Sequence, residues 1–157
     1  MRVKFRWLLP IAHAAIGGIL VVFFCGCRTK VSPPVTVEYW HTGDDGLSQK
    51  LQVAVETAFR ESTDFRLTAT DIVGRRLIVW TMRNVEGELV GDRTKATYTV
   101  RFSSLDDNAS RTPDLQQRLS LAMEISTQRG SCWESEMSRC AAQILSDART
   151  AARKVQQ

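Results

Sequence analysis

The chain of 157 residues is long enough for one domain with a buried core, and its composition, 43% apolar and 24% charged, is ordinary for a globular protein. The formal charge of +4 suggests an anionic partner, but Arg2, Lys4 and Arg6 precede every acidic residue. The rest of the chain is nearly neutral, so we expect no nucleic-acid partner.

Residues 1–26 have the pattern of a signal peptide. The basic segment MRVKFR is followed by an apolar stretch over residues 7–24, which is short for a membrane-spanning helix of about 20 apolar residues. The alternative is a retained single-pass anchor, and the residues that follow favour cleavage.

Phe24-Cys25-Gly26-Cys27 resembles the lipobox of bacterial lipoproteins, in which a small residue precedes the cysteine that is acylated. Gly26 is that small residue, whereas bulky Phe24 makes Cys25 a poorer candidate. The resemblance implies that Cys27 carries the lipid and anchors the chain in a bacterial envelope. Because Arg28 follows, and not aspartate, it favours the outer membrane, facing the periplasm.

The lipidated N-terminus and a proline-containing spacer occupy residues 27–35, since Pro33-Pro34 favours an extended conformation. We expect a single α+β domain over residues 36–157. A first strand is predicted at its start, over residues 35–40, from the β-branched and aromatic content of VTVEYW.

A helix is predicted from Leu47 onward, with Asp44 or Asp45 capping its start. Its apolar residues recur at helical spacing and form one stripe: Leu47, Leu51, Ala54, Val55, Ala58 and Phe59.

Three further strands are predicted over residues 65–70, 76–85 and 94–103, with a polar turn, EGELVGD, before the last. That last strand alternates cleanly, which indicates a sheet covered on one side. Its apolar face consists of Ala96, Tyr98, Val100 and Phe102.

After a loop over residues 106–114, alternation over residues 119–126 predicts another strand, although residues 115–123 could instead open as a helix. Helical spacing over residues 133–155 predicts a long C-terminal helix. The order is β-α-β-β-β-β-α, so we predict an α+β two-layer sandwich in which two helices cover a mostly antiparallel sheet.

His41 is the only histidine after residue 26, and it lies near Asp44 and Asp45. A metal or acid–base site would need more ligands or a partner, and no such spacing is present. We interpret this stretch as a strand end, a turn and a helix cap. No nucleophile or nucleotide motif occurs, so we expect no enzyme, metal or cofactor.

Cys132 and Cys140 are eight positions apart, too far for a disulfide within one helix. Pairing requires Cys132 to lie in a turn, with Ser135 capping the helix. If Ser131 is the cap, with Glu134 completing a capping box, the bond cannot form. An oxidising periplasm favours the disulfide, and we expect a structural bond.

Arg75, Arg76 and Arg83 lie on or beside one predicted strand. They could form an anion-binding face for a lipid phosphate or a glycan carboxylate. The alternative is a solvated face of the sheet.

Residues 46–71, GLSQKLQVAVETAFRESTDFRLTATD, loosely resemble small lipoproteins of two bacterial groups: those that assist the lipopolysaccharide translocon, and those of curli secretion and synthase activation. The resemblance implies a non-enzymatic, membrane-tethered accessory that binds a protein partner in envelope assembly or transport. The alternative is a periplasmic module that binds a small ligand or a lipid phosphate.

Overall fold

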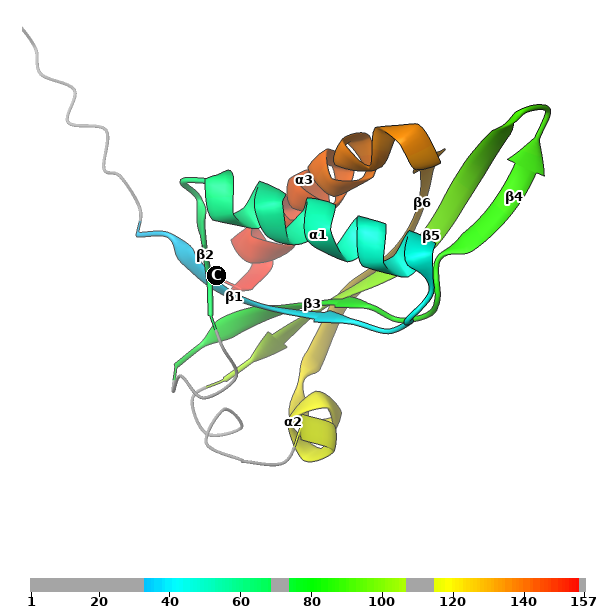
Figure 1. Cartoon of the computed structure of the whole chain (residues 1–157). Coiled ribbons are helices and arrows are strands. Elements are labelled where there is room, and N and C mark those ends of the chain that lie inside the picture. Colours follow the sequence, from blue (N-terminus) through cyan, green and yellow to red (C-terminus); the bar gives the residue numbers. More distant parts are fainter. Residues whose placement is uncertain (1–32, 69–73, 107–114, 156–157) are drawn as a thin grey trace, which may run out of the picture. The chain divides into compact units, whose positions relative to one another are not determined.

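Both predicted amphipathic helices and the alternating strand are present in the computed structural model, in which the strands form one mixed sheet and the two helices pack on it (Figure 1). The structure describes residues 33–68, 74–106 and 115–155. The strands are β1 (Val35–His41), β2 (Phe65–Leu67), β3 (Arg76–Thr81), β4 (Glu86–Val90), β5 (Arg93–Leu105) and β6 (Met123–Trp133). The helices are α1 (Gly46–Glu61), α2 (Leu115–Leu121) and α3 (Met137–Val155), with a 3₁₀ turn, Glu134–Glu136, before α3. The predicted α+β class is therefore confirmed, and the structure adds the strand β4.

The sheet is built around the 13-residue strand β5. On one edge of β5, the first half of the strand pairs with β4 and the second half pairs with β3. β6 pairs with the other edge of β5. All three pairings are antiparallel. β1 lies on the far side of β3 and runs parallel to both β3 and β2. Most strand pairs are thus antiparallel, as predicted.

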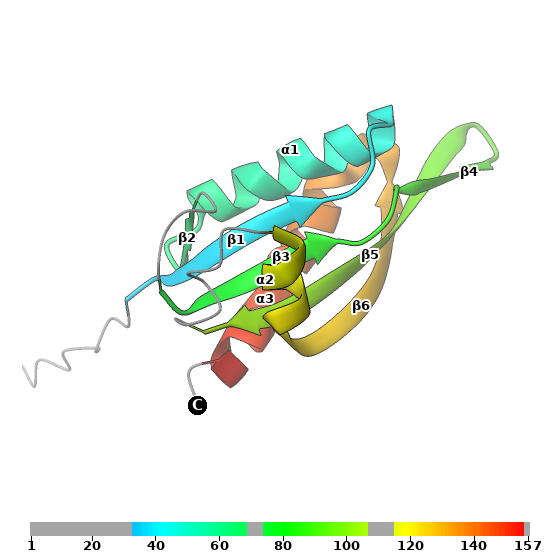
Figure 2. The ribbon, with the colours of Figure 1, turned by 90° about the horizontal axis from the view of Figure 1, so that it is seen from below.

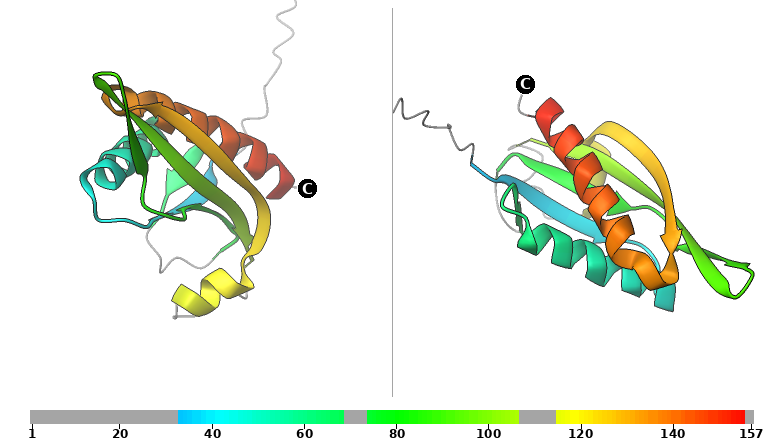
Figure 3. Two further views of the ribbon diagram at one scale, coloured as in Figure 1. Left: turned by 90° about the vertical axis from the view of Figure 1, so that its right-hand side faces the viewer. Right: turned by 90° about the horizontal axis from the view of Figure 1, so that it is seen from above.

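The core lies between the sheet and the two long helices, which cross one face of the sheet side by side (Figure 3). From α1 the fully buried side chains are Leu51, Val55 and Phe59, three members of the predicted stripe. The predicted apolar face of β5 is also buried, because its residues point toward these helices. The buried residues of α3 are Met137, Cys140, Ala141, Ile144, Ala148, Ala151, Ala152 and Val155.

Asp45 is the N-cap of α1, which selects one of the two predicted aspartates. Its Oδ1 accepts hydrogen bonds from the backbone N–H groups of Leu47 and Ser48 at 2.9 and 3.0 Å. The Ser48 hydroxyl donates to Oδ2 at 2.6 Å and lowers the pKa of the Asp45 carboxyl. The same hydroxyl accepts from the backbone N–H of Val85 at 2.9 Å, so the cap also ties the start of α1 to the segment before β4.

Residues 86–92, predicted as a polar turn, instead contain β4 and a two-residue turn, Gly91-Asp92, that folds it onto β5. Gly91 has a φ of 65°, the left-handed conformation that glycine adopts without steric cost. The prediction was wrong because all five residues of β4 are exposed, and a strand that buries nothing has no apolar alternation.

The predicted strand over residues 119–126 also differs from the structure. Residues 115–121 form α2, the alternative left open by the sequence, and β6 runs from Met123 to Trp133. The C-terminal helix accordingly begins at Met137, not at residue 133. β6 is polar along most of its length, and it is a strand because its backbone pairs with β5 from Lys95 to Ser104.

Candidate functional site

The face of the sheet opposite α1 and α3, called the outer face below, is only partly covered. α2 lies against it, over β3 and β5 (Figure 2). Beneath α2, Ile78, Leu105 and Ala122 form a small buried apolar cluster, with Trp40 and Trp80 packed against it. The rest of this face, toward β4, carries half-exposed polar side chains.

A buried ionic cluster lies beside this apolar cluster. The Glu38 carboxylate, 2% exposed, lies 3.0 Å from Nε of Arg76 and 3.9 Å from Nη2 of Arg118. Burial raises the pKa of the Glu38 carboxyl, and the two guanidinium groups oppose that rise. Since Arg118 belongs to α2, the cluster attaches this helix to β1 and β3.

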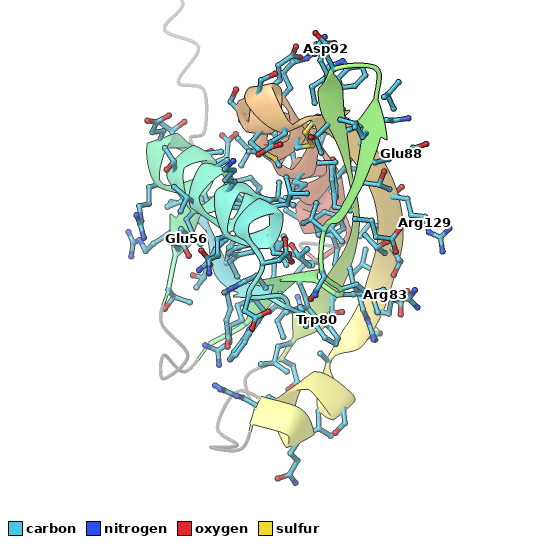
Figure 4. All side chains as sticks on the ribbon, turned by 45° about the vertical axis from the view of Figure 1, so that its right-hand side comes forward. Glu56, Trp80, Arg83, Glu88, Asp92 and Arg129 are labelled. Carbon is cyan, nitrogen blue, oxygen red and sulfur yellow. A yellow bond between two sulfur atoms is a disulfide. The ribbon has the colours of Figure 1, made fainter. Side chains whose placement is uncertain are left out.

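The three arginines of the predicted anion-binding face do not share one surface. Arg76 is 1% exposed and pairs with Glu38, whereas Arg75 and Arg83 are both exposed. Arg75 and Arg83 flank β3 at opposite ends, roughly 25 Å apart along an extended chain. Arg83 instead lies near Arg129 of β6, on the same side of the sheet (Figure 4).

Cys132 and Cys140 form a disulfide with a Cα–Cα distance of 5.7 Å. Cys132 lies at the end of β6, however, and not in the turn that the sequence suggested. The chain reverses direction in the 3₁₀ turn between β6 and Met137, so that Cys132 lies next to the first turn of α3, where Cys140 is buried. The bond therefore joins the edge of the sheet to the helix that covers it.

His41 is exposed at the end of β1. The nearby carboxylate of Asp45 is engaged in capping α1, in agreement with the interpretation of this stretch as a turn and a cap. Within the described ranges, no group of three or more His, Cys, Asp or Glu side chains is arranged to hold a metal ion.

An exposed feature is the hairpin of β4 and the start of β5, residues 86–97, called the projecting hairpin below. It extends past the start of α1 (Figure 1). Leu89 and Val90 are 74% and 44% exposed. Among the described strands β4 pairs only with β5, so its outer edge offers unpaired backbone groups. Such edges are usually protected by charged side chains, most often lysine, by proline or by a bulge. β4 has neither lysine nor proline, and its charges are the carboxylates of Glu86 and Glu88.

The first described residues lie at the other end of the sheet. β1 and β3 are parallel, and the chain enters at the start of β1, whereas the hairpin follows the end of β3. Pro33 accordingly lies beside Phe65 of β2 and Arg153 near the end of α3. The combined lengths of β1 and β4, taken from the rise per residue of a strand, place the start of β1 and the hairpin tip on the order of 40 Å apart.

The sequence did not indicate Glu38, Leu89 or Arg129 as site residues. A signal existed for Glu38, because it shares its face of β1 with Trp40, an aromatic residue that favours burial. Leu89 and Arg129 carry no such signal, since their importance depends on which strand edge is unpaired and which strands are neighbours. Cys27, the predicted lipid-attachment residue, lies outside the described residues.

No protein-family description and no curated protein matches this chain. Two solved structures show a low similarity. A hypothetical protein from Chlamydia trachomatis is 7% identical over 65% of this chain and 73% of its own, with a TM-score of 0.36. A minor lipoprotein from Acinetobacter baumannii is 12% identical over 76% of this chain and 94% of its own, with a TM-score of 0.34. Similarities this low support no argument about fold or function.

None of the helices in the described ranges is both long and apolar enough to cross a membrane.

Proposed function

We propose that this chain is a non-enzymatic lipoprotein, anchored through Cys27, whose domain binds a protein partner in bacterial envelope assembly or transport. The projecting hairpin is the contact surface, and an extended segment of the partner adds a strand to the outer edge of β4. The observation that carries the proposal is the exposure of all five residues of β4 along an edge that no described strand covers.

The position of the hairpin supports this arrangement. A chain tethered at Cys27 enters the domain at the start of β1, at the end of the sheet remote from the hairpin. Pro33 and Pro34 precede β1 and favour an extended conformation there. The hairpin thus lies at the end of the sheet remote from the first described residues, and in this proposal that end is the one a partner within the envelope reaches.

Charge favours a different protein over a second copy of this chain. β4 contributes the carboxylates of Glu86 and Glu88 and no cation, and Asp92 follows in the turn. Two β4 strands side by side would bring like charges together, which is destabilising. The complementary segment is extended, with an apolar residue that covers Leu89 and with lysine or arginine near the carboxylates.

Replacing Cys27 by alanine is expected to abolish lipid labelling and to move the protein out of the membrane fraction. The reason is that buried acyl chains, at about 0.8 kcal/mol per CH₂, supply the membrane affinity. Metabolic labelling with a palmitate analogue and fractionation of cells measure both effects. Cys25→Ala is the matched control and should keep the label. A chain that stays in the membrane unlabelled, with its N-terminus intact, would instead be held by residues 7–24.

A photo-crosslinking amino acid at position 89 is expected to capture one protein in intact cells, whereas the same amino acid at position 53 captures none. Val53 on α1 is a matched control because it is also apolar and 65% exposed. Identification of the captured protein by mass spectrometry allows direct binding to be measured with purified components.

In that binding assay, Leu89→Asp should weaken the association at least tenfold, because covering a leucine side chain contributes about 1.5–3 kcal/mol. Val53→Asp should leave the affinity unchanged. Equal capture from both positions, or an affinity that Leu89→Asp does not alter, would count against the hairpin as the contact.

A further inference from the structure

We propose that the hollow on the outer face at the base of the projecting hairpin binds the phosphate of a phosphate ester that also carries a hydroxyl group. The hollow has a volume of about 120 Å³. This is well below the roughly 300 Å³ or more of a drug-sized site, so the space suits a small ligand such as one tetrahedral oxyanion. Its polar lining consists of Arg83, Asn84, Glu86, Thr97, Thr99 and Arg129.

Four separate segments bring these groups together. Thr97 and Thr99 lie on the outer face of β5, because the alternate residues Tyr98 and Val100 are buried on the other face. Arg129 of β6 is directly opposite Thr99 in the register. Glu86 of β4 is opposite Thr97.

Arg83 and Asn84 close the hollow from the segment between β3 and β4. Figure 4 shows Arg83 and Arg129 on the same side of the sheet. The hollow therefore exists only when β4 and β6 both pair with β5.

The charges around the hollow favour an anion. The structure contains no ion pair of Arg83 or Arg129 with any carboxylate in the described ranges. Two other basic residues of the same strand face are neutralised, since Arg93 pairs with Glu136 and Arg101 with Glu124. Guanidinium groups bind phosphate oxygens with paired hydrogen bonds.

The uncharged groups and Glu86 define the rest of the ligand. The hydroxyls of Thr97 and Thr99 and the amide of Asn84 can each donate to a phosphate oxygen. The Glu86 carboxylate only accepts, and it would repel a bare phosphate. If the ligand carries a hydroxyl near its phosphate, that hydroxyl can donate a hydrogen bond to the Glu86 carboxylate. Such esters occur both as soluble metabolites and as lipid headgroups.

The test is calorimetric titration of the purified full chain with glycerol 3-phosphate, with inorganic phosphate and with dihexanoyl phosphatidylglycerol. Arg83→Gln and Arg129→Gln should each weaken binding of the favoured ester about tenfold or more, since a hydrogen bond to a charged group contributes about 1.5–3 kcal/mol. Arg75→Gln is the matched control, because Arg75 is also exposed but precedes β3 at its other end. Glu86→Gln should remove the preference for an ester over inorganic phosphate.

Tighter binding of glycerol 3-phosphate identifies a soluble source, and tighter binding of the phosphatidylglycerol identifies a lipid headgroup; both support the site. The proposal is overturned if neither ester binds, or if Arg75→Gln weakens binding as much as Arg83→Gln. Leu89→Asp should leave phosphate affinity unchanged, so failure of the partner contact and failure of this site are separable.

Discussion

Replacing Glu38 by glutamine is expected to destabilise the domain by about 3–5 kcal/mol, the usual result of breaking a buried ion pair by removing one partner. The carboxylate lies between Arg76 and Arg118, and all three side chains are less than a tenth exposed. Loss of its charge leaves the buried guanidinium groups with less compensation in a site that water does not reach. This cost exceeds the gain from no longer burying the carboxylate charge, the desolvation that raises the pKa of Glu38. Because total stabilities are about 5–15 kcal/mol, urea unfolding of the purified full chain should show the loss clearly.

The matched control is Glu56→Gln. Glu56 also pairs with an arginine, Arg60 at 2.8 Å, but on the surface of α1. An exposed pair of this kind contributes about 0.3–0.5 kcal/mol, so the control should be nearly as stable as the unchanged chain. Equal losses for the two variants would mean that the buried cluster contributes no more than a surface pair.

A second readout separates the role of the cluster from general destabilisation. Arg118 is the only member on α2, so Arg118→Gln should release α2 before the rest of the domain unfolds. Amide hydrogen exchange is then expected to rise in Leu115–Leu121 and to stay unchanged in α1. Uniform exchange throughout the domain would show that the cluster does not specifically hold α2. If Glu38→Gln does not fold, Arg118→Gln still tests whether the ionic cluster holds α2.

Reduction of the Cys132–Cys140 disulfide is expected to cost about 2–3 kcal/mol, from the loop-closure entropy of a crosslink eight positions apart. The bond joins the end of β6 to the first turn of α3, so its loss should loosen the contact between this edge strand and the helix. The measurement is urea unfolding of the same protein with and without a reductant.

The double variant Cys132→Ala/Cys140→Ala is the control for this experiment. It should have the lower stability in both conditions and should not respond to the reductant. If the reductant does not change the free energy of unfolding of the unchanged chain, the prediction is wrong. The bond would then join segments that packing already holds together.

The parts of the fold predicted well were those in which burial leaves a periodic pattern. In α1 the stripe of Leu51, Val55 and Phe59 identified the helix and its buried face. In β5 the alternation identified both the strand and the side that the helices cover. Asp45 was recognisable as a cap because a carboxylate accepts the free N–H groups at a helix start.

The parts that the sequence did not predict are those in which backbone pairing, and not burial, decides the structure. β4 is exposed throughout and β6 is largely polar, so neither has an apolar period, and both depend on β5 as a partner. The candidate sites have the same origin. The ionic cluster needs β1, β3 and α2 together, and the hollow needs β4, β5 and β6.

The sequence by itself determined the α+β class, both long helices and the buried face of β5, whereas lipid attachment at Cys27 stays a prediction. These depend on local composition and period, which act over a few neighbouring residues. Only the tertiary structure decided that Arg76 is buried with Glu38 while Arg83 joins Arg129, and that β4 presents an unpaired edge. Strand order and register place such residues together, and both arise from contacts between segments far apart in the chain.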